Sequence, residues 1–155
     1  MAQLHKVEGQ VEIKSNANKF FEIWARKTNL ISEWCRDKYP KIELNEGTYW
    51  HSLGAIITWH FFALGRHDYV KTIVAEIDDD NKIVSYDYTE GHGQLRSNYK
   101  SLKSKIQAIP KGEGCIVKWS FEYEKKCENV PDARIYIDFL LDCAKNIDAR
   151  LCGST

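Results

Sequence analysis

The sequence has no excess of either charge: 22 lysines and arginines balance 22 aspartates and glutamates, and the formal net charge is zero. Without an overall positive field, we expect no binding to nucleic acid. No stretch approaches the roughly 18 consecutive apolar residues of a membrane-spanning helix. The first residues also lack the charged-then-apolar layout of a signal peptide. We therefore expect a cytoplasmic protein that does not insert into membranes.

The cysteines lack the spacing of a metal or disulfide framework. There are five of them, an odd number, with no C-x-x-C pair and no histidine at a ligand-like distance. The pattern favours free thiols in a reducing compartment over disulfide or zinc chemistry. These cysteines are Cys35, Cys115, Cys127, Cys143 and Cys152.

Motifs of nucleotide hydrolysis and covalent hydrolysis are missing too. The loop around Gly47 and Gly54 lacks the Gly-Lys-Ser/Thr end of a P-loop, and no G-x-S-x-G nucleophile elbow exists. The histidines are dispersed, without the spacing of zinc ligands. We expect neither a metal site nor a cofactor.

What is present fits one domain covering residues 1–155, long enough to bury roughly 68–70% of its unfolded surface. Residues 4–14 alternate between apolar and polar, which predicts a strand with one solvent-exposed face. Ser15 stands where a helix N-cap belongs, and an apolar stripe predicts a short helix that fades near Thr28. A second short helix is expected from Leu30 to Cys35.

From residue 41 onward the period is two. We predict strands over 42–44, 55–63, 68–77, 82–89, 95–109 and 115–123, joined by short turns that favour antiparallel pairing. After Pro131 the period becomes 3.6, which predicts an amphipathic helix of about twenty residues. Within one domain, only the concave face of the sheet is large enough to receive that helix. The fold class is therefore α+β.

Residue parity assigns side chains to the two faces of each strand. In the last strand Trp119 and Phe121 share the inner face, and in the strand from residue 82 Tyr86 and Tyr88 do so. Aromatic residues at this density either fill a core or line a cavity. The two phenols favour a cavity, because a buried hydroxyl needs a hydrogen-bonding partner.

Several segments resemble a known family over essentially the whole chain. They are LHKVEGQVEIKSNANKFFEIW, LNEGTYWHSLGAIITW, YTEGHGQLRSNYKSLK, IPKGEGCIVKWSFEYEK and VPDARIYIDFLLDCAKNIDARL. The most specific motifs are E-G-x-x-x-x-x-x-G, Y-K-S, and P-K-G-x-G followed by E-Y-E-K. The chain resembles the major latex proteins of plants, a branch of the Bet v I (pathogenesis-related class ten) superfamily.

The resemblance implies a helix-grip (START-like) fold, with a seven-stranded antiparallel sheet around a long C-terminal helix and two short helices after the first strand. It also implies a large internal cavity that binds a small hydrophobic or amphipathic plant metabolite, without a cofactor. The segment between Trp24 and Gly47 is shorter than is usual in the family, which affects the cavity entrance. The implied ligand contacts are Trp59, Phe61, Tyr86, Tyr88, Leu102, Val117, Trp119, Tyr136, Leu140 and Cys143.

Catalysis is the alternative to simple binding. Some relatives are cofactor-free cyclases or isomerases of plant specialised metabolism that act on iridoid, terpenoid or alkaloid intermediates in the same cavity. In that case one or two phenols or a histidine would move a proton. The candidate catalytic residues are Tyr86, Tyr88 and His92. Neither the ligand nor the oligomeric state follows from the sequence.

Overall fold

The computed structural model describes residues 4–63, 65–92, 98–127, 129–130 and 133–153. Seven strands and four helical segments follow one another along this part of the chain. In order they are β1 (Leu4–Ile13), α1 (Ala17–Phe21), η1 (Glu22–Arg26), α2 (Asn29–Trp34), β2 (Lys41–Glu46), β3 (Ile56–Ala63), β4 (Arg66–Asp78), β5 (Ile83–His92), β6 (Tyr99–Lys111), β7 (Gly114–Lys125) and α4 (Arg134–Leu151).

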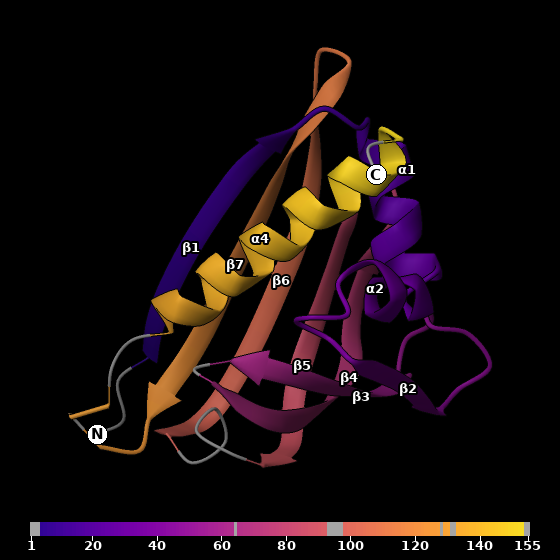
Figure 1. Ribbon diagram of the computed structural model, residues 1–155. Coiled ribbons are helices and arrows are strands. Elements are labelled where there is room, and N and C mark those ends of the chain that lie inside the picture. The colour runs from indigo at the N-terminus through magenta and orange to yellow at the C-terminus, as the bar shows by residue number, and fades with distance from the viewer. Residues whose placement is uncertain (1–3, 64, 93–97, 128, 131–132, 154–155) are drawn as a thin grey trace.

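The strands form one antiparallel sheet in the order β1-β7-β6-β5-β4-β3-β2. Helix α4 runs diagonally across one face of this sheet, and α1 and α2 lie beside the C-terminal end of α4 (Figure 1). This arrangement confirms the predicted α+β fold, in which the sheet wraps around a long C-terminal helix. The connections between β3 and β4, β4 and β5, and β6 and β7 are short, as predicted, whereas the loop between β2 and β3 spans residues 47–55. Strands β2 to β6 each pair with the next strand in sequence.

The face assignment from parity is confirmed by burial. In β7 the inner residues Val117, Trp119 and Phe121 are buried, while their neighbours are partly or fully exposed. In β3 the outward residue Thr58 is an exception, because its hydroxyl donates a hydrogen bond to the Asn45 side chain and the residue is buried. The alternation fixes which side chains can face α4.

Helix α4 lies closest to β1, where a glycine makes room for it. A side chain at Gly9 would collide with Ile137 and press on Leu141, both on α4. The helix buries an apolar stripe against the sheet, as its 3.6-residue period predicts. The buried residues of α4 are Tyr136, Ile137, Leu140, Cys143, Ala144 and Ile147.

The start of the first helix differs from the prediction. Its N-cap is Asn16, whose side-chain oxygen accepts a hydrogen bond from the backbone N–H of Lys19 at 2.8 Å. Ser15 was the predicted cap, but its hydroxyl instead donates to Asp148 Oδ1 at 2.6 Å. The prediction was wrong because the sequence does not show that α4 brings a carboxylate to Ser15.

The helix that the sequence predicts as one piece is divided. α1 continues into η1, a π-helical turn in which the N–H of Lys27 donates to the carbonyl of Glu22. The wider turn buries Ile23, Trp24 and Ala25 in succession. Three consecutive residues of a regular α-helix spread over roughly 200° around its axis, which is wider than a narrow apolar stripe. The π turn therefore directs Trp24 into the interior.

The remaining strand limits agree with the predictions within a few residues. The predicted start of the 95–109 strand lies partly outside the described residues, and β6 begins at Tyr99.

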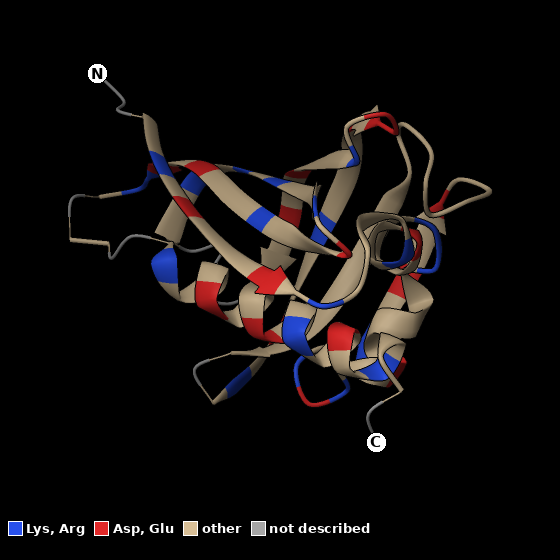
Figure 2. Cartoon of the chain, turned by 90° about the horizontal axis from the view of Figure 1, so that it is seen from above, with Lys and Arg blue, Asp and Glu red and all other residues tan. Residues whose placement is uncertain are grey.

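Charged residues of both signs are interspersed over the strands and α4 (Figure 2). In the described part of the chain, no helix has the length and apolar character needed to cross a membrane.

Candidate functional site: an aromatic pocket between the sheet and the helices

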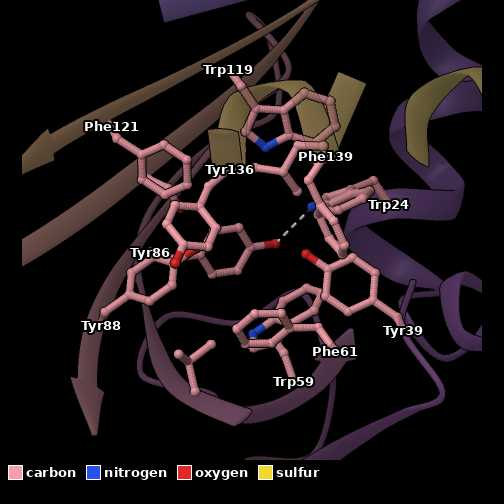
Figure 3. A pocket seen from close by; sticks show the side chains of 13 residues that line it. Trp24, Tyr39, Trp59, Phe61, Tyr86, Tyr88, Trp119, Phe121, Tyr136 and Phe139 are labelled. Carbon is pink, nitrogen blue, oxygen red and sulfur yellow. Dashed lines mark hydrogen bonds between the residues drawn. The ribbon is translucent and has the colours of Figure 1, made fainter. Parts of the chain in front are cut away.

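A pocket lies between the sheet, η1 and α4 (Figure 3). The sheet contributes its floor, α4 contributes one wall, and Trp24 of η1 and Tyr39 reach in from the helical end. Ten of the 13 lining residues are aromatic. The lining residues are Trp24, Tyr39, Trp59, Phe61, Val70, Tyr86, Tyr88, Ser104, Trp119, Phe121, Tyr136, Phe139 and Leu140.

Strand register explains how the floor is assembled. Ser104 of β6 lies opposite Phe121 of β7 and opposite Tyr86 of β5. Trp59 of β3 lies opposite Val70 of β4. Because paired residues in an antiparallel ladder point to the same face, these side chains form a continuous inner surface across five strands.

The aromatic rings pack against one another around the pocket. Trp24 stacks on Trp59 with ring centroids 5.8 Å apart, and it meets Trp119 edge to face at 5.0 Å. Trp59 also meets Tyr86 edge to face at 5.7 Å. Edge-to-face and offset pairs of this kind stabilise ring positions beyond simple burial. The pocket wall is thus a connected aromatic network.

The free space inside is narrow. The cavity volume is only about 30 Å³, which is room for roughly two or three waters. This is much less than the large cavity that the family resemblance implies. The physical reason is that rings from outside the sheet, those of Trp24, Tyr39 and Phe139, occupy the interior.

Two of the indole N–H groups have protein acceptors. Trp24 Nε1 donates to Tyr86 Oη at 3.1 Å, and Trp59 Nε1 donates to Thr72 Oγ1 at 2.9 Å. Tyr86 therefore accepts one hydrogen bond with its oxygen and keeps its own proton for another partner. These bonds fix the orientation of two rings that line the pocket.

The phenols remain protonated because they are buried. Burial raises the pKa of Tyr88 to about 12, although a hydrogen bond with Ser104 opposes the shift. Burial also raises the pKa of Tyr86, against the effect of the Trp24 hydrogen bond. For Tyr39, burial is again the main cause of a raised pKa, and Cys143 adds to it. At neutral pH these groups can donate protons in hydrogen bonds, and they do not act as bases.

Seven of the predicted ligand-contacting residues line this pocket. Three others are buried outside its lining. Leu102 lies one inward step beyond Ser104 on β6, opposite Tyr123, and Val117 lies one inward step beyond Trp119 on β7, opposite Ala108. The seven in the lining are Trp59, Phe61, Tyr86, Tyr88, Trp119, Tyr136 and Leu140.

Cys143 is the third predicted contact that does not line the pocket. Its thiol donates to Cys35 Sγ at 2.9 Å, beneath the C-terminal end of α2. Burial, together with the neighbouring Cys35, raises the pKa of Cys143 well above its usual value. The structure records both cysteines as free and buried. Cys143 therefore belongs to the packing between α2 and α4.

Six lining residues are not among the predicted ligand contacts. Trp24 and Tyr39 lie outside the strands, so strand parity says nothing about them. Phe139 lies beside the apolar stripe predicted for α4, and its neighbour Leu140 was predicted to contact the ligand. Parity places Phe121 on the inner face, although Phe121 was not predicted as a ligand contact. The same rule could have found Val70 and Ser104, because each lies on the inner face of its strand.

The histidine candidate cannot be placed in the pocket. His92 is the last residue of β5 and pairs with Tyr69 of β4 in the sheet register, but its side chain lies outside the described part of the structure. His60 faces outward, as predicted, and its Nε2 lies 2.9 Å from Glu43 Oε1. Within the described residues, no group of three or more histidine, cysteine or acidic side chains could hold a metal ion.

The carboxylate of Asp68 is buried but does not line the pocket. Asp68 is opposite Phe61 in the register of β3 and β4, so both point to the inner face. Burial raises the pKa of Tyr136, and the Asp68 carboxylate raises it further, while Arg66 opposes the shift. The pocket lining itself contains no charged residue.

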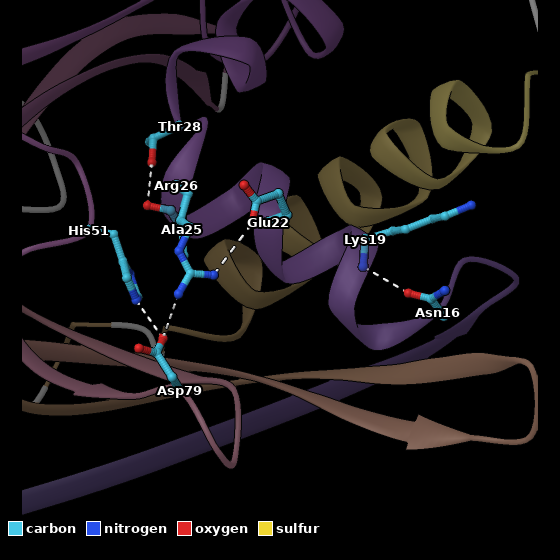
Figure 4. Close-up of polar contacts among 8 residues, drawn as sticks. All are labelled: Asn16, Lys19, Glu22, Ala25, Arg26, Thr28, His51 and Asp79. Atoms are coloured by element: carbon cyan, nitrogen blue, oxygen red, sulfur yellow. Dashed lines mark hydrogen bonds and ion pairs between the residues drawn. The ribbon is translucent and has the colours of Figure 1, made fainter.

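Polar contacts fasten the helical end of the pocket to the sheet (Figure 4). His51 Nε2 lies 2.6 Å from Asp79 Oδ1, and Arg26 Nη2 donates to the same oxygen at 3.2 Å. Thr28 Oγ1 donates to the carbonyl of Trp24 at 2.7 Å. The two contacts of Asp79 connect the turn after β4 with η1 and with the loop after β2. The Thr28 bond is made to the backbone of Trp24 itself.

Comparison with known proteins identifies the family. Residues 2–154 match the group described as the Pathogenesis-related protein Bet v 1 family. The chain belongs to the Bet v 1 family. This Bet v 1 family chain is 32% identical to MLP-like protein 43 of Arabidopsis thaliana over 148 residues, which cover 94% of the chain and 92% of that protein.

A second relative is longer. The chain is 32% identical to MLP-like protein 34 of Arabidopsis thaliana over 147 residues, which cover 94% of the chain but only 46% of that protein. The Bet v 1 family chain therefore spans about half the length of this relative. The resemblance to major latex proteins in the sequence is confirmed.

Solved structures agree on the fold. The ginseng major latex-like protein 151 from Panax ginseng superimposes with a TM-score of 0.89 at 29% identity, covering 95% of this chain and 97% of that one. Truncated norcoclaurine synthase from Thalictrum flavum superimposes with a TM-score of 0.78 at 18% identity, covering 99% and 97%. At that identity, the second similarity shows a shared Bet v 1 fold only.

Proposed function

We propose that the protein binds a small apolar or amphipathic plant metabolite in the pocket between the sheet and α4. The observation that supports this most directly is the pocket itself, which is lined mostly by aromatic residues and contains the hydroxyl groups of several tyrosines. Pockets that are largely apolar with a few convergent polar groups are the usual form of small-molecule sites. The Bet v 1 family membership supports the same function.

Native mass spectrometry after incubation with a plant metabolite extract tests this proposal. A carrier retains a compound unchanged, so the complex gains mass while the small-molecule fraction loses only that compound. The variant Val70→Phe, which fills the pocket, should retain little, whereas Ile116→Phe on the opposite face of β7 should retain as much as wild type. If wild type retains no compound and converts none, the proposal is wrong.

Catalysis is the second candidate function, and the protonated phenols favour it. A cofactor-free cyclase or isomerase needs a group that donates to a carbonyl or enol as charge develops, and Tyr86 and Tyr88 are buried proton donors. His92 remains a predicted partner in proton transfer. The same extract experiment would reveal an enzyme by a compound that is consumed and replaced by a product.

Affinity and turnover, measured separately, distinguish the two functions. In a carrier, Tyr88→Phe should cost about 0.5–1.5 kcal/mol of affinity. In an enzyme the same change should lower the rate by about 10²–10⁴-fold while binding hardly changes. Tyr86→Phe and His92→Ala complete the set. Unchanged turnover in all three variants would exclude these residues as the catalytic groups.

We place the protein in the cytosol as part of the same proposal. The five cysteines are free, including the adjacent pair Cys35 and Cys143. Free thiols persist in reducing compartments.

A further inference from the structure

The polar groups of the pocket are unequal in hydrogen-bonding capacity. An indole N–H only donates, whereas a phenol both donates and accepts. Trp119 Nε1 is directed into the pocket and has no acceptor among the described residues (Figure 3). Any ligand atom that meets this N–H must therefore be an acceptor.

Two phenols point toward the same space. The hydroxyl of Tyr86 lies at the centre of the pocket, and the hydroxyl of Tyr39 is directed toward it from the helical end (Figure 3). Tyr86 Oη already accepts the N–H of Trp24, so its proton is the part left for a ligand. Tyr39 Oη has no hydrogen-bonding partner within the described part of the chain.

We propose that Trp119, Tyr39 and Tyr86 form a three-donor site for the carbonyl oxygen of an uncharged, otherwise apolar ligand. This inference rests on the proposed ligand-binding function and names the class of compound. A carbonyl oxygen accepts two hydrogen bonds and brings no proton that would need a partner of its own. Two of the three donors are satisfied by one such atom.

Charged ligands do not fit this site. No lysine, arginine, histidine, aspartate or glutamate lines the pocket, so a buried ammonium or carboxylate would have no counter-ion there. Burying an unpaired charge is far more costly than burying a neutral group. The phenols also stay protonated, because burial raises the pKa of both Tyr39 and Tyr86. They therefore offer donors to a neutral acceptor.

The test uses three small probes of nearly equal shape. Acetophenone carries a carbonyl, cumene replaces the carbonyl oxygen with a methyl group, and 1-phenylethylamine carries an ammonium at neutral pH. Affinities for wild type, Tyr39→Phe, Tyr86→Phe and Trp119→Phe are measured by isothermal titration. The exposed Tyr49→Phe is the matched control. The affinity for cumene, which needs no hydrogen bond, reports whether each variant keeps its pocket.

The ratio of acetophenone to cumene affinity isolates the hydrogen bonds. Because a carbonyl oxygen accepts two hydrogen bonds, we expect this ratio to fall a few-fold to roughly tenfold in two of the three donor variants and to stay constant in Tyr49→Phe. We also expect 1-phenylethylamine to bind most weakly. In infrared spectra, the carbonyl stretch of bound acetophenone should lie below its position in hexane and return toward that position in the same two variants.

The possible failures are distinct. A carbonyl stretch at the hexane position in wild type, an unchanged affinity ratio in all three variants, or tightest binding of the ammonium would overturn the three-donor site. In each of these cases cumene binding leaves the proposed ligand-binding function standing. If none of the three probes binds, the three-donor site is wrong, whereas the ligand-binding function is decided separately by the extract experiment.

Discussion

At the scale of single residues, the hydrogen bond between Trp24 and Tyr86 couples the helical end of the pocket to its floor. The donor comes from η1 and the acceptor from β5, and the two residues are 62 positions apart in the sequence. Both side chains are buried, so the bond is shielded from bulk solvent. The contact therefore contributes to stability as well as to the shape of the pocket.

Tyr86→Phe leaves the indole N–H of Trp24 buried without an acceptor. An unsatisfied buried donor costs about 1–3 kcal/mol, and we expect the free energy of unfolding to fall by that amount. Urea denaturation followed by far-ultraviolet circular dichroism measures it. Tyr49→Phe, in an exposed loop, should be neutral. Equal stability of the two variants would mean that the bond to Trp24 is not formed in solution.

Residue parity predicts the floor of the pocket well and its helical side poorly. The inner rows of β3, β5 and β7 follow from alternation, because a strand has only two faces. Trp24 and Tyr39 are different, since a π turn and a loop direct them inward. No short-range pattern in the sequence reports on such turns, so the residues that narrow the pocket could not be predicted.

At the scale of elements, Asp148 connects α4 to the end of β1. Its carboxylate accepts hydrogen bonds from the hydroxyl and N–H of Ser15 and from the N–H of Lys14. Burial alone would raise the pKa of Asp148, but these hydrogen bonds outweigh it and the pKa is lowered. The ionised form is therefore favoured in the folded protein.

Asp148→Asn should destabilise the protein in a pH-dependent way. A carboxyl whose pKa is lowered by folding adds stability above its unfolded pKa, and this stability is lost as the pH falls through the folded pKa. We expect a loss of about 1 kcal/mol at neutral pH that shrinks below the ordinary pKa of 3.8. Thermal unfolding between pH 2 and 7, roughly the span of carboxyl titration, measures it. Exposed Asp138→Asn on the same helix is the control, and a pH-independent difference would contradict the expectation.

The close approach of β1 and α4 gives a second prediction at this scale. Gly9→Ala places a methyl group against Ile137 and Leu141 of α4, and inserting atoms into a packed interface costs about 1–3 kcal/mol. Gln10→Ala, on the outer face of β1, should change stability little. Chemical denaturation compares the two. If Gly9→Ala were as stable as wild type, α4 would lie farther from β1.

At the scale of the whole molecule, the tertiary fold decides which thiols are accessible. Cys127 and Cys152 are exposed, whereas the other three are buried. Burial raises the pKa of Cys115 to about 11, and the neighbouring Asp148 adds to the shift, so little thiolate forms there. Thiolate is the reactive form. The folded chain therefore has two reactive cysteines and three protected ones.

Labelling with a maleimide should modify two cysteines in the native protein and all five after unfolding without reductant. Intact-mass spectrometry counts the labels. The sequence predicts five free thiols, but it does not predict that Cys35 and Cys143, 108 positions apart, have sulfur atoms 2.9 Å apart. Three labels after unfolding would indicate that this pair is oxidised in the purified protein.

Entry of a ligand into the pocket requires a change in conformation. Because the free space holds roughly two or three waters, a metabolite can enter only when aromatic side chains or the helical end move. The helical end is fastened by Asp79, which meets both His51 and Arg26 at the turn after β4. The ion pair between Arg26 and Asp79 is exposed, and exposed pairs of this kind are worth only about 0–1 kcal/mol. The contact between η1 and the turn can therefore open without unfolding of the sheet.

If opening precedes binding, the observed association rate should level off as the ligand concentration rises, because the opening step becomes limiting. Stopped-flow tryptophan fluorescence with a hydrophobic probe measures this plateau. Asp79→Ala should raise the plateau severalfold by releasing η1 from the turn, whereas Lys19→Ala, at an exposed position of α1, should leave it unchanged. A rate that increases linearly without a plateau would show that the pocket admits ligands in its resting conformation.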